Sequence, residues 1–546
     1  MKFRKEILII LVDIMLTAAI LAACSLAQPA TDNGRQKTTD KVQTTTPLPV
    51  SPLPSSPALS SPTSFSPALS SPTPISPALS SPTSFSPALS SPSPLPSASL
   101  SPTPSTPDLP VHSHTQYALT AQFNYTAHTL SVSETVTYTN ATTATLIDLL
   151  FIVEPNLFPG SFRLDTAYWQ EGKPVEPYTL EGDRLRIPLP QPLPPGRSTG
   201  LTLGYELTLP PIPPPEDNTK PQPFGYTARQ TNVVDWYPFL PPYRPGQGWL
   251  AHDPWFYGEY LVYDVGDYRV DIQRTDPAPE LTIAASAPAE RSGELYRYRF
   301  DAGRSFAISA SPEYRVYSET VGTTTVLSYV FPLTPEAGQA TLWYTADALV
   351  LYNDLFGAYP HASLSVVEAD FLDGMEYEGL FFLSNGFYNL YDGSPRGYLT
   401  AIAAHETAHQ WWYGLVGNDQ ALEPWLDEGL CTYSERLFYE HYYPDLVDWW
   451  WSFRVNFYHP TGHVNSPIYN YNGFRPYRDA VYLRGALFLE NLRKEIGDEA
   501  FFAFLKDYAA QGAHRQATTK DFFAILAKHT TVDISGLVKE YFEVIK

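Results

Sequence analysis

Residues 405–409 read His-Glu-Thr-Ala-His, and Glu428 follows after eighteen intervening residues. Two histidines four positions apart on an α-helix lie on one face, so His405 and His409 can both reach a single metal ion. With Glu428 as the third ligand, a tetrahedral zinc ion keeps one position open for water, which is typical of a catalytic site. Glu406, between the histidines, is placed to accept a proton from that water. The pattern therefore predicts a catalytic centre that holds one zinc ion.

An isolated His-Glu-x-x-His can arise by chance in a solvated helix, so the flanking sequence tests the zinc hypothesis. Residues 398–404 are apolar and compatible with a helix, and two tryptophans, Trp411 and Trp412, follow the second histidine. Pro424 stands where a second helix, the one that carries Glu428, is expected to begin. Because this context accompanies the motif, we favour the zinc site over a chance match.

These residues resemble the zinc aminopeptidases of the aminopeptidase N and leukotriene hydrolase family, which are gluzincin metallopeptidases. Residues 373–379 read Asp-Gly-Met-Glu-Tyr-Glu-Gly, which is similar to the family's Gly-x-Met-Glu-Asn segment. The resemblance implies that Glu376 binds the free amino group of the substrate. Residues 481–486 read Val-Tyr-Leu-Arg-Gly-Ala, which is similar to the family's Tyr-x-Lys-Gly-Ala element. The resemblance implies that Tyr482 stabilises the tetrahedral intermediate.

The implied chemistry is hydrolysis of a peptide bond. Water on zinc, activated by Glu406, attacks a carbonyl that the metal also polarises. The negative charge that develops on the carbonyl oxygen is shared between zinc and the hydroxyl of Tyr482. Tyr477 is the nearest competing tyrosine, and Tyr482 is preferred because Gly-Ala follows it within a predicted helix at 482–494.

Four positions depart from the family pattern. Asp373 and Glu378 add negative charge beside Glu376, which either strengthens the binding of an ammonium group or reflects exposed loop positions. Arg484 replaces the usual lysine and keeps its charge, and Asp427 replaces the usual asparagine before the zinc glutamate. None of these changes removes a residue that the reaction needs.

Two further residues lie near Glu428 in the sequence. Glu435 follows seven positions later, on the same helical face, and is either a partner of a metal ligand or part of a solvated face. The solvated face is the favoured interpretation. Cys431 lies one turn after Glu428, and we expect it to pack in the interior rather than to bind metal.

Residues 1–24 have the layout of a secretory signal peptide, with basic residues ahead of a mostly apolar run. The segment ends in Leu-Ala-Ala-Cys, which resembles the bacterial lipobox, so Cys24 is expected to be lipidated and to tether the protein to the membrane. An uncleaved membrane anchor is the alternative, although Asp13 interrupts the run. Both alternatives place the folded part outside the cytoplasm, as a bacterial membrane lipoprotein in the first case.

Residues 25–112 are predicted to form a disordered stalk rich in Pro, Ser and Thr. The stretch contains four copies of Ser-Pro-Ala-Leu-Ser-Ser-Pro, which begin at Ser56, Ser66, Ser76 and Ser86. Frequent prolines favour extended polyproline conformations over a packed core. At ~3.1 Å per residue the stalk could hold the enzyme on the order of 100 to 200 Å from the membrane.

Residues 113–318 are predicted to form an amino-terminal β-domain, either a twisted sheet or a sandwich. Apolar and polar residues alternate in several segments that are bounded by Pro and Gly. These segments are 117–123, 130–138, 200–209 and 268–272. By the resemblance, this domain forms one wall of the substrate cleft.

Residues 319–546 are predicted to form a thermolysin-like α/β zinc-peptidase domain with a mainly helical second lobe. Its expected early elements are strands at 323–331, 363–368 and 379–384, and a helix at 335–355 capped by Thr334. The strand at 379–384 is expected to be the edge strand beside the site. After Glu428 the chain reads as mainly helical, and Thr518 resembles a helix start. The fold class is therefore multidomain α+β.

The whole chain is acidic, with 57 Asp and Glu against 35 Lys and Arg, a formal net charge of −22. An acidic protein is a poor partner for nucleic acid or for anionic lipid headgroups. The expected partners are peptide substrates and, through Cys24, the membrane. Since Cys24 and Cys431 are the two cysteines, a lipidated Cys24 leaves no disulfide partner.

The sequence therefore predicts an extracytoplasmic zinc aminopeptidase on a long stalk. Two alternatives stay open: a zinc endopeptidase acting on surface proteins, and a non-catalytic peptide-binding surface lipoprotein. The presence of Glu406 speaks against the last, since a binding protein does not need a general base. By the resemblance, many relatives continue into a large helical carboxy-terminal domain that this sequence lacks, so a more open cleft is expected.

Overall fold

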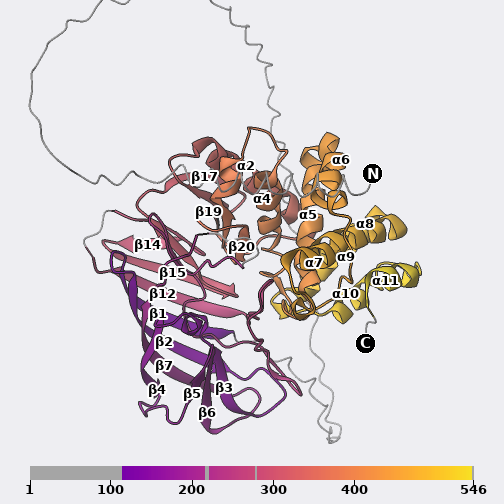
Figure 1. Cartoon of the computed structure of the whole chain (residues 1–546). Helices are drawn as coiled ribbons and strands as arrows, with labels where there is room; N and C mark the ends of the chain where they lie inside the picture. The colour runs from indigo at the N-terminus through magenta and orange to yellow at the C-terminus, as the bar shows by residue number, and fades with distance from the viewer. Residues whose placement is uncertain (1–113, 215–219, 277–279, 544–546) are drawn as a thin grey trace, which may run out of the picture. The chain divides into compact units, whose positions relative to one another are not determined.

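The computed structural model describes residues 114–214, 220–276 and 280–543 (Figure 1). These residues belong to one compact unit, 109–546. The predicted signal peptide, the stalk and Cys24 lie outside the described residues, so the lipid anchor stays a prediction. Within the described ranges, no helix combines the length and the apolar character that crossing a bilayer demands.

A seven-stranded sheet is the largest element of the first part of this unit (Figure 1). Its order is β14-β15-β12-β1-β2-β7-β4, with β1 and β12 parallel and the other neighbours antiparallel. The strands are β1 (Thr115–Asn124), β2 (Thr129–Thr139), β4 (Phe162–Trp169), β7 (Ser198–Thr208), β12 (Gly266–Arg274), β14 (Ala289–Ser292) and β15 (Leu295–Gly303). Buried and exposed residues alternate along β1 because one face of the sheet lies on the core. The strands predicted at 117–123, 130–138, 200–209 and 268–272 are confirmed, apart from one residue at the end of β7.

Three smaller sheets complete the first part. A three-stranded sheet has the order β3-β6-β5, a four-stranded sheet the order β13-β16-β9-β8, and β10 pairs with β11. The strands are β3 (Leu146–Ile152), β5 (Thr179–Glu181), β6 (Arg184–Leu193), β8 (Gly225–Tyr226), β9 (Thr231–Val233), β10 (Tyr243–Arg244), β11 (Gly248–Trp249), β13 (Thr282–Ala285) and β16 (Ile308–Ser311). Apolar side chains of these sheets and of the seven-stranded sheet share one buried cluster, which gives the region a sandwich-like core.

A five-stranded sheet with the order β17-β18-β19-β21-β20 supports the second part. Its strands are β17 (Arg315–Val321), β18 (Thr324–Val330), β19 (Ser363–Ala369), β20 (Gly374–Tyr377) and β21 (Leu380–Ser384). The expectation that the strand at 379–384 lies at the edge is wrong. The chain turns at Gly379, φ +80°, and β20 pairs with β21 as a hairpin, so β20 takes the edge position. β17 spans the predicted domain boundary at 318/319, and that boundary stays a prediction.

Helices cover this sheet and make up most of the rest of the chain (Figure 1). They are α2 (Pro335–Phe356), α3 (Asn385–Asn389), α4 (Tyr398–Ala408), α5 (Glu428–Tyr442), α6 (Val447–Trp450), α7 (Phe474–Arg478), α8 (Arg484–Ile496), α9 (Asp498–Gly512), α10 (Thr519–Leu526) and α11 (Ser535–Tyr541); a short pair, β22 (Val416–Gly417) and β23 (Arg515–Gln516), lies between them. The predicted helix at 335–355 and the helix start at Thr518, with its capping box, are confirmed. Thr334 does not cap α2 with its side chain, because its hydroxyl donates to Glu368 instead, at 2.8 Å.

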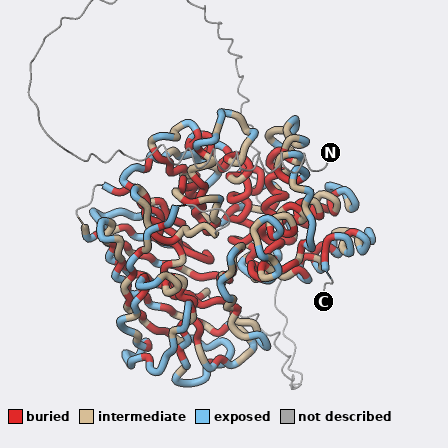
Figure 2. The backbone as a smooth tube through the Cα atoms, viewed as in Figure 1, coloured by how far each residue is buried: buried red, intermediate tan, exposed pale blue. Residues whose placement is uncertain are grey.

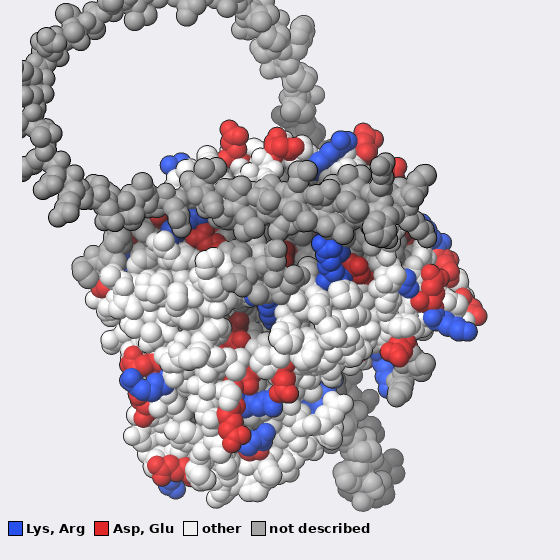
Figure 3. Space-filling model, viewed as in Figure 1, with Lys and Arg blue, Asp and Glu red and all other residues white. Residues whose placement is uncertain are grey.

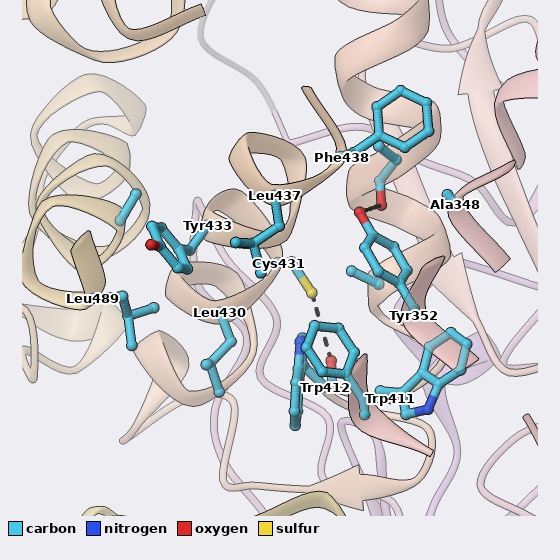
Figure 4. Close-up of a cluster of buried hydrophobic side chains, with 14 of the residues drawn as sticks. Ala348, Tyr352, Trp411, Trp412, Leu430, Cys431, Tyr433, Leu437, Phe438 and Leu489 are labelled. Atoms are coloured by element: carbon cyan, nitrogen blue, oxygen red, sulfur yellow. Dashed lines mark hydrogen bonds between the residues drawn. The ribbon is translucent and has the colours of Figure 1, made fainter. Parts of the chain in front are cut away.

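The helical core surrounds the elements that carry the predicted metal ligands (Figure 2). The hydroxyl of Tyr352 on α2 lies 3.1 Å from the carbonyl oxygen of Ala404 and 2.9 Å from that of Ser434, so one side chain joins three helices. Figure 4 shows Cys431 in the same cluster, with its sulfur 3.8 Å from the carbonyl oxygen of Trp412. Cys431 has no exposed surface, which agrees with the packing role expected from the sequence.

Candidate metal centre and active site

The two histidines lie at the carboxyl end of α4, and Glu428 is the first residue of α5. α4 packs against both α2 and α5, and its residues from Ala403 to Ala408 are all buried. The prediction that the helix carrying Glu428 begins at Pro424 is wrong. A 3-10 turn, Pro424–Leu426, comes first, and the side chain of Asp427 then accepts a hydrogen bond from the amide of Glu428 at 2.7 Å. This cap fixes Glu428 at the first turn, opposite the histidines.

The three predicted ligands converge as a metal site requires. The candidate ligand atoms of His405, His409 and Glu428 all lie within 4.8 Å of one another. One oxygen of Glu428 lies 3.1 Å from Nε2 of His405 and 3.6 Å from Nε2 of His409. None of the three residues exceeds 3% exposure. Two imidazole nitrogens and one carboxylate oxygen around a buried point are a donor set that suits zinc.

The outer nitrogens of both imidazoles are held by hydrogen bonds. Nδ1 of His405 donates to Glu435 at 2.9 Å, and Nδ1 of His409 donates to the carbonyl oxygen of Trp412 at 3.1 Å. With its proton on Nδ1, each ring turns the lone pair of Nε2 toward Glu428. Both the types of the donor atoms and the tautomers of the two imidazoles therefore suit the binding of a metal ion.

Glu435 is not part of a solvated face, so the favoured sequence interpretation is wrong and the alternative, a partner of a metal ligand, is the correct one. The side chain has no exposed surface. Besides His405, it binds the guanidinium of Arg454 at 2.9 Å and the indole nitrogen of Trp450 at 3.1 Å. Trp450 is the last residue of α6, Arg454 lies in the π-helical turn Trp451–Val455 that follows, and together they cover this face of α5. A helical pattern alone does not reveal that covering segment.

These contacts control the protonation of the ligands before metal binds. Burial opposes the protonation of His405, but hydrogen bonds with Glu428 and Glu435 raise its pKa to about 9. Burial also opposes ionisation of Glu428, yet the hydrogen bonds from His405 and His409 hold its pKa below the usual range. The metal-free cluster therefore retains protons at neutral pH that a metal ion must displace.

Glu406 lies against the edge strand of the five-stranded sheet. A Cβ atom on Gly374 would stand 2.0 Å from Oε1 of Glu406, so the glycine permits this close approach. Oε2 of Glu406 is buried and has no hydrogen-bond partner among the described residues. Burial raises the pKa of Glu406 to about 8, against the opposing charges of His409 and His405. A buried carboxyl oxygen without a partner, beside the candidate metal ligands, is placed to accept a proton from water.

Tyr482 lies over the first metal ligand. Its ring is parallel to that of His405, with 5.9 Å between the ring centroids and 4° between the planes. The helix predicted at 482–494 begins at Arg484 in the structure, and Tyr482 belongs to a π-helical turn, Asp479–Leu483, ahead of it. The competitor Tyr477 is 1% exposed and lies against Gly258, whereas Tyr482 is partly exposed beside the ligands.

Glu376 projects from β20 toward the metal ligands. Its carboxylate oxygens are within 4.8 Å of candidate ligand atoms of Glu406, His409 and Glu428. Gln420 donates to Glu376 at 3.1 Å. Gln410, which follows α4, accepts from the amide of Gly379 at 2.9 Å and so joins α4 to the turn after β20. The predicted amine-binding residue and the metal ligands are thus held in one frame.

Comparison with known proteins agrees with this geometry. Residues 342–541 match the model of the peptidase family M1 domain. This part of the chain is an M1 domain. Aminopeptidase M1-D of Oryza sativa subsp. japonica is 26% identical over 217 residues, 37% of this chain and 25% of the relative. Aminopeptidase M1 of Arabidopsis thaliana is 25% identical over 222 residues, 38% of this chain and 25% of the relative.

The chain therefore spans about a quarter of the length of these curated relatives. Among solved structures, an M1 zinc metallopeptidase from Deinococcus radiodurans matches with a TM-score of 0.57 and 20% identity, over 79% of this chain and 95% of that chain. A mutant of that peptidase bound to a Tyr-Ser-Ala substrate matches with a TM-score of 0.55. The described fold is thus that of the M1 zinc metallopeptidases.

Glu259 is a residue of the site that sequence reasoning missed. It lies in the connection between β11 and β12, yet its carboxylate is within 4.8 Å of candidate ligand atoms of Glu376 and Glu428. Burial and the neighbouring charge of Glu376 raise its pKa well above the usual range. Lys220 donates to the carbonyl oxygen of Gly258 at 2.8 Å and holds this connection in place. No motif marks Glu259, because its contacts to the M1 domain are made across the fold.

The four departures from the family pattern have separate explanations. Glu378 is 1% exposed and points away from the site, where it pairs with Nε2 of His361 at 2.6 Å and accepts from the amide of Arg304 at 2.8 Å. Neither sequence interpretation holds for Glu378, since it is neither exposed nor directed at an ammonium group. Arg484 donates to the carbonyl oxygen of Glu540 and lies 4.5 Å from the ring centroid of Tyr541, so it joins α8 to α11.

The remaining two departures lie at the ends of elements beside the site. Asp427 acts as the cap of α5 described above, a role that asparagine shares. Asp373 precedes β20, has a left-handed backbone with φ +63°, and exposes its side chain. On the face shown in Figure 3, acidic and basic side chains are both visible at the hollow between the β-rich part and the helices, within a largely uncharged surface.

Proposed function

We propose that this protein is a zinc-dependent aminopeptidase that removes single residues from the amino terminus of peptides. One observation carries the proposal: a carboxylate oxygen of Glu376 and one of Glu259 lie within 4.8 Å of an oxygen of Glu428, with no cation bound to Glu376 or Glu259 directly among the described residues. A peptide ammonium group is a cation of the right size for that position. The similar proteins described above are aminopeptidases and a zinc metallopeptidase, which supports the same activity.

The spacing of the site selects the first peptide bond. In a peptide the amino nitrogen and the carbonyl carbon of one residue are only two bonds apart, roughly 2.5 Å. An amino group held between Glu376 and Glu259 therefore brings the first carbonyl to the metal site, while the second carbonyl lies one residue further along, about 3.5 Å away. Binding of the amino group between the two carboxylates therefore selects the first peptide bond for cleavage.

His405, His409 and Glu428 would hold the zinc ion, which when bound would supply an activated water molecule and polarise the carbonyl group. Glu406 accepts a proton from the water through its unpartnered oxygen and can return it to the departing amino nitrogen. The hydroxyl of Tyr482 donates a hydrogen bond to the carbonyl oxygen as negative charge develops there. Glu435, held by Arg454, keeps the His405 ring in the orientation that this geometry needs.

The first experiment measures hydrolysis of Leu-Ala-Ala and of its amino-acetylated form by the purified protein, with Glu406→Gln as the inactive control. The proposal expects cleavage of the free peptide after the first residue, no cleavage of the acetylated peptide, and loss of cleavage in the control. Equal cleavage of both peptides would favour a zinc endopeptidase. Zinc binding with no cleavage of either would favour a non-catalytic binding protein.

We also propose that the enzyme acts outside the cytoplasm and is anchored through a lipid on Cys24. The support is the signal-peptide layout of residues 1–24 and the Leu-Ala-Ala-Cys ending. Metabolic labelling with an alkyne fatty acid is expected to mark the full-length protein and not the Cys24→Ser variant. Equal labelling of both proteins, or labelling of neither, would contradict the anchor.

A further inference from the structure

Asp373 is a charged residue of the cleft that the proposed mechanism does not use. Its side chain is exposed, and it precedes Gly374, the residue that touches Glu406. The surrounding protein raises the pKa of its carboxyl by burial, while the charges of Arg454 and Arg478 act against that shift. The charges of Glu428 and His405 also reach Asp373. Asp373 is therefore a partly exposed residue at the start of β20, next to the glycine that touches Glu406.

The carboxylate of Asp373 has no ion-pair or hydrogen-bond partner among the residues that the structure describes. The two nearby arginines are already engaged. Arg454 binds Glu435 through two nitrogens at 2.9 Å. Arg478 binds its neighbour Asp479 at 2.6 Å and lies 3.8 Å from the ring centroid of Tyr458. A cation that enters the recess would meet an unpaired negative charge at Asp373.

The order of residues along β20 gives the direction of the substrate. Glu376, which binds the amino group in the proposed function, lies at one end, and Gly374, beside Glu406, marks the position of the reacting carbonyl. Asp373 is the next residue in the same direction, so it lies on the side of the departing peptide. Three residues of strand span roughly 10 Å, which is about the distance from a peptide's amino nitrogen to the end of a long second side chain.

The left-handed backbone of Asp373 carries a steric cost that glycine would avoid. Its φ is +63°, and asparagine and aspartate tolerate this region better than other residues with a Cβ atom. Since the fold would accept glycine here without strain, the side chain itself is the feature that distinguishes this position. The backbone also fixes where the carboxylate is presented, because Ser384 donates to the carbonyl oxygen of Asp373 at 2.9 Å.

We propose that Asp373 is a specificity-determining residue for the second residue of the substrate and selects a cationic side chain, lysine or arginine, at that position. The inference rests on the proposed aminopeptidase function and deepens it by naming a peptide class. The charged end of such a side chain meets the carboxylate of Asp373, while the bond that precedes this residue is the one that is cleaved.

The test compares kcat/KM for Leu-Lys-Ala, Leu-Ala-Ala and Leu-Glu-Ala with the full-length enzyme and with Asp373→Asn. Asparagine keeps the shape and tolerates the left-handed backbone but removes the charge. The wild type is expected to prefer Leu-Lys-Ala over Leu-Glu-Ala roughly tenfold or more, as a partly screened charge pair allows. In Asp373→Asn the ratio of kcat/KM for Leu-Lys-Ala to that for Leu-Glu-Ala is expected to fall toward one.

Asp373→Gly is a second variant that also removes the backbone strain, so the comparison does not depend on the folding of one substitution. The preference is expected to weaken in 0.5 M salt as well, since screening reduces a charge interaction that water reaches. An unchanged preference in both variants, or a wild type that cleaves all three peptides equally, would overturn the inference and leave the aminopeptidase function intact. Cleavage of none of the peptides would overturn the proposed function itself.

Discussion

Two groups of carboxylates lie around the metal site, and they differ in whether a cation accompanies them. Behind the ligands, Glu435 is bound by Arg454, and on the far side of β20, Glu378 is bound by His361 and lies beside Arg304. Although burial opposes ionisation, hydrogen bonds and the charges of Arg454 and Arg304 lower the pKa of both carboxyls. These carboxylates hold the structure together.

The carboxylates on the proposed substrate side of the ligands have no directly bound cation among the described residues. Glu376 lies close to Glu406 in one group of carboxylates and to Glu259 and Glu428 in another. Burial raises the pKa of Glu376 and of Glu259, and the charges of Glu428 and Glu376 respectively add to these shifts. Lys220, whose charge opposes the shift at Glu259, donates to the backbone carbonyl of Gly258. Buried carboxyls with raised pKa values and no directly bound cation are typical of functional sites, and a cationic group of the substrate would favour their ionised form. Paired carboxylates therefore mark the scaffold, and unpaired ones mark the substrate site.

The largest expected effect separates the proposed general base from an exposed carboxylate elsewhere in the chain. Glu406→Gln is expected to lower kcat by about 10² to 10⁴, because proton transfer from water is lost while the three metal ligands are unchanged. Zinc content and the melting temperature are expected to stay near wild-type values. Glu495→Gln, a change at an exposed helical position, is the matched control and should leave kcat unchanged. Turnover above a tenth of wild type in Glu406→Gln would contradict the assignment.

Next in size is the comparison of the two tyrosines. Tyr482→Phe is expected to reduce kcat about a hundredfold to a thousandfold, since one hydrogen-bond donor to the developing charge is removed. Tyr477→Phe removes a buried hydroxyl that has no partner among the described residues, so kcat should change much less. Steady-state kinetics on Leu-Ala-Ala tests both. A larger loss in Tyr477→Phe would show that the roles are reversed.

Stability measurements sharpen the contrast between paired and unpaired carboxylates. Glu435→Gln leaves the guanidinium of Arg454 buried without its carboxylate, which is expected to lower the free energy of unfolding by about 3 to 5 kcal/mol. Glu376→Gln removes an unpaired buried carboxyl, so the free energy of unfolding should stay the same or rise. Urea unfolding of both variants, with metal chelated, gives the two values. Equal destabilisation would remove the basis of the comparison.

The smallest expected effect concerns the acid stability that Glu378 provides. Because His361 and Arg304 lower its pKa in the folded state, its stabilising contribution is complete above the unfolded value, about 4.3. That contribution is lost as the pH falls through the lower folded value. Between about pH 5 and pH 3, the free energy of unfolding should therefore fall more steeply in wild type than in Glu378→Gln. Parallel urea-unfolding curves against pH would contradict this.

Local pattern in the sequence was enough to predict the strands and the convergence of the three candidate metal ligands. The alternation in β1 and β2 and the spacing of His405, His409 and Glu428 depend on residues that are near in sequence or on one helix. The edge position of β20 could not be predicted in the same way. Which strand lies at an edge depends on hydrogen bonds with a neighbouring strand, and the turn at Gly379 decides that pairing.

The partners of the site were the least predictable part. Glu435 becomes buried because Trp450 and Arg454 cover it after α5, and Glu259 reaches the site from the β-rich part of the chain. Both contacts form only when distant segments meet. The start of α8 was misplaced for a local reason, because the chain makes a π-helical turn at Tyr482 that has no distinct residue pattern.

The most direct test of the account is the ratio of kcat/KM for Leu-Ala-Ala to that for acetyl-Leu-Ala-Ala in wild type, Glu376→Gln and Glu376→Gln with Glu259→Gln. If the unpaired carboxylates bind the amino group, wild type shows a large ratio, Glu376→Gln a much smaller one, and the double variant a ratio near one. A ratio that is large in all three proteins would contradict the central claim that these carboxylates recognise the substrate's amino terminus.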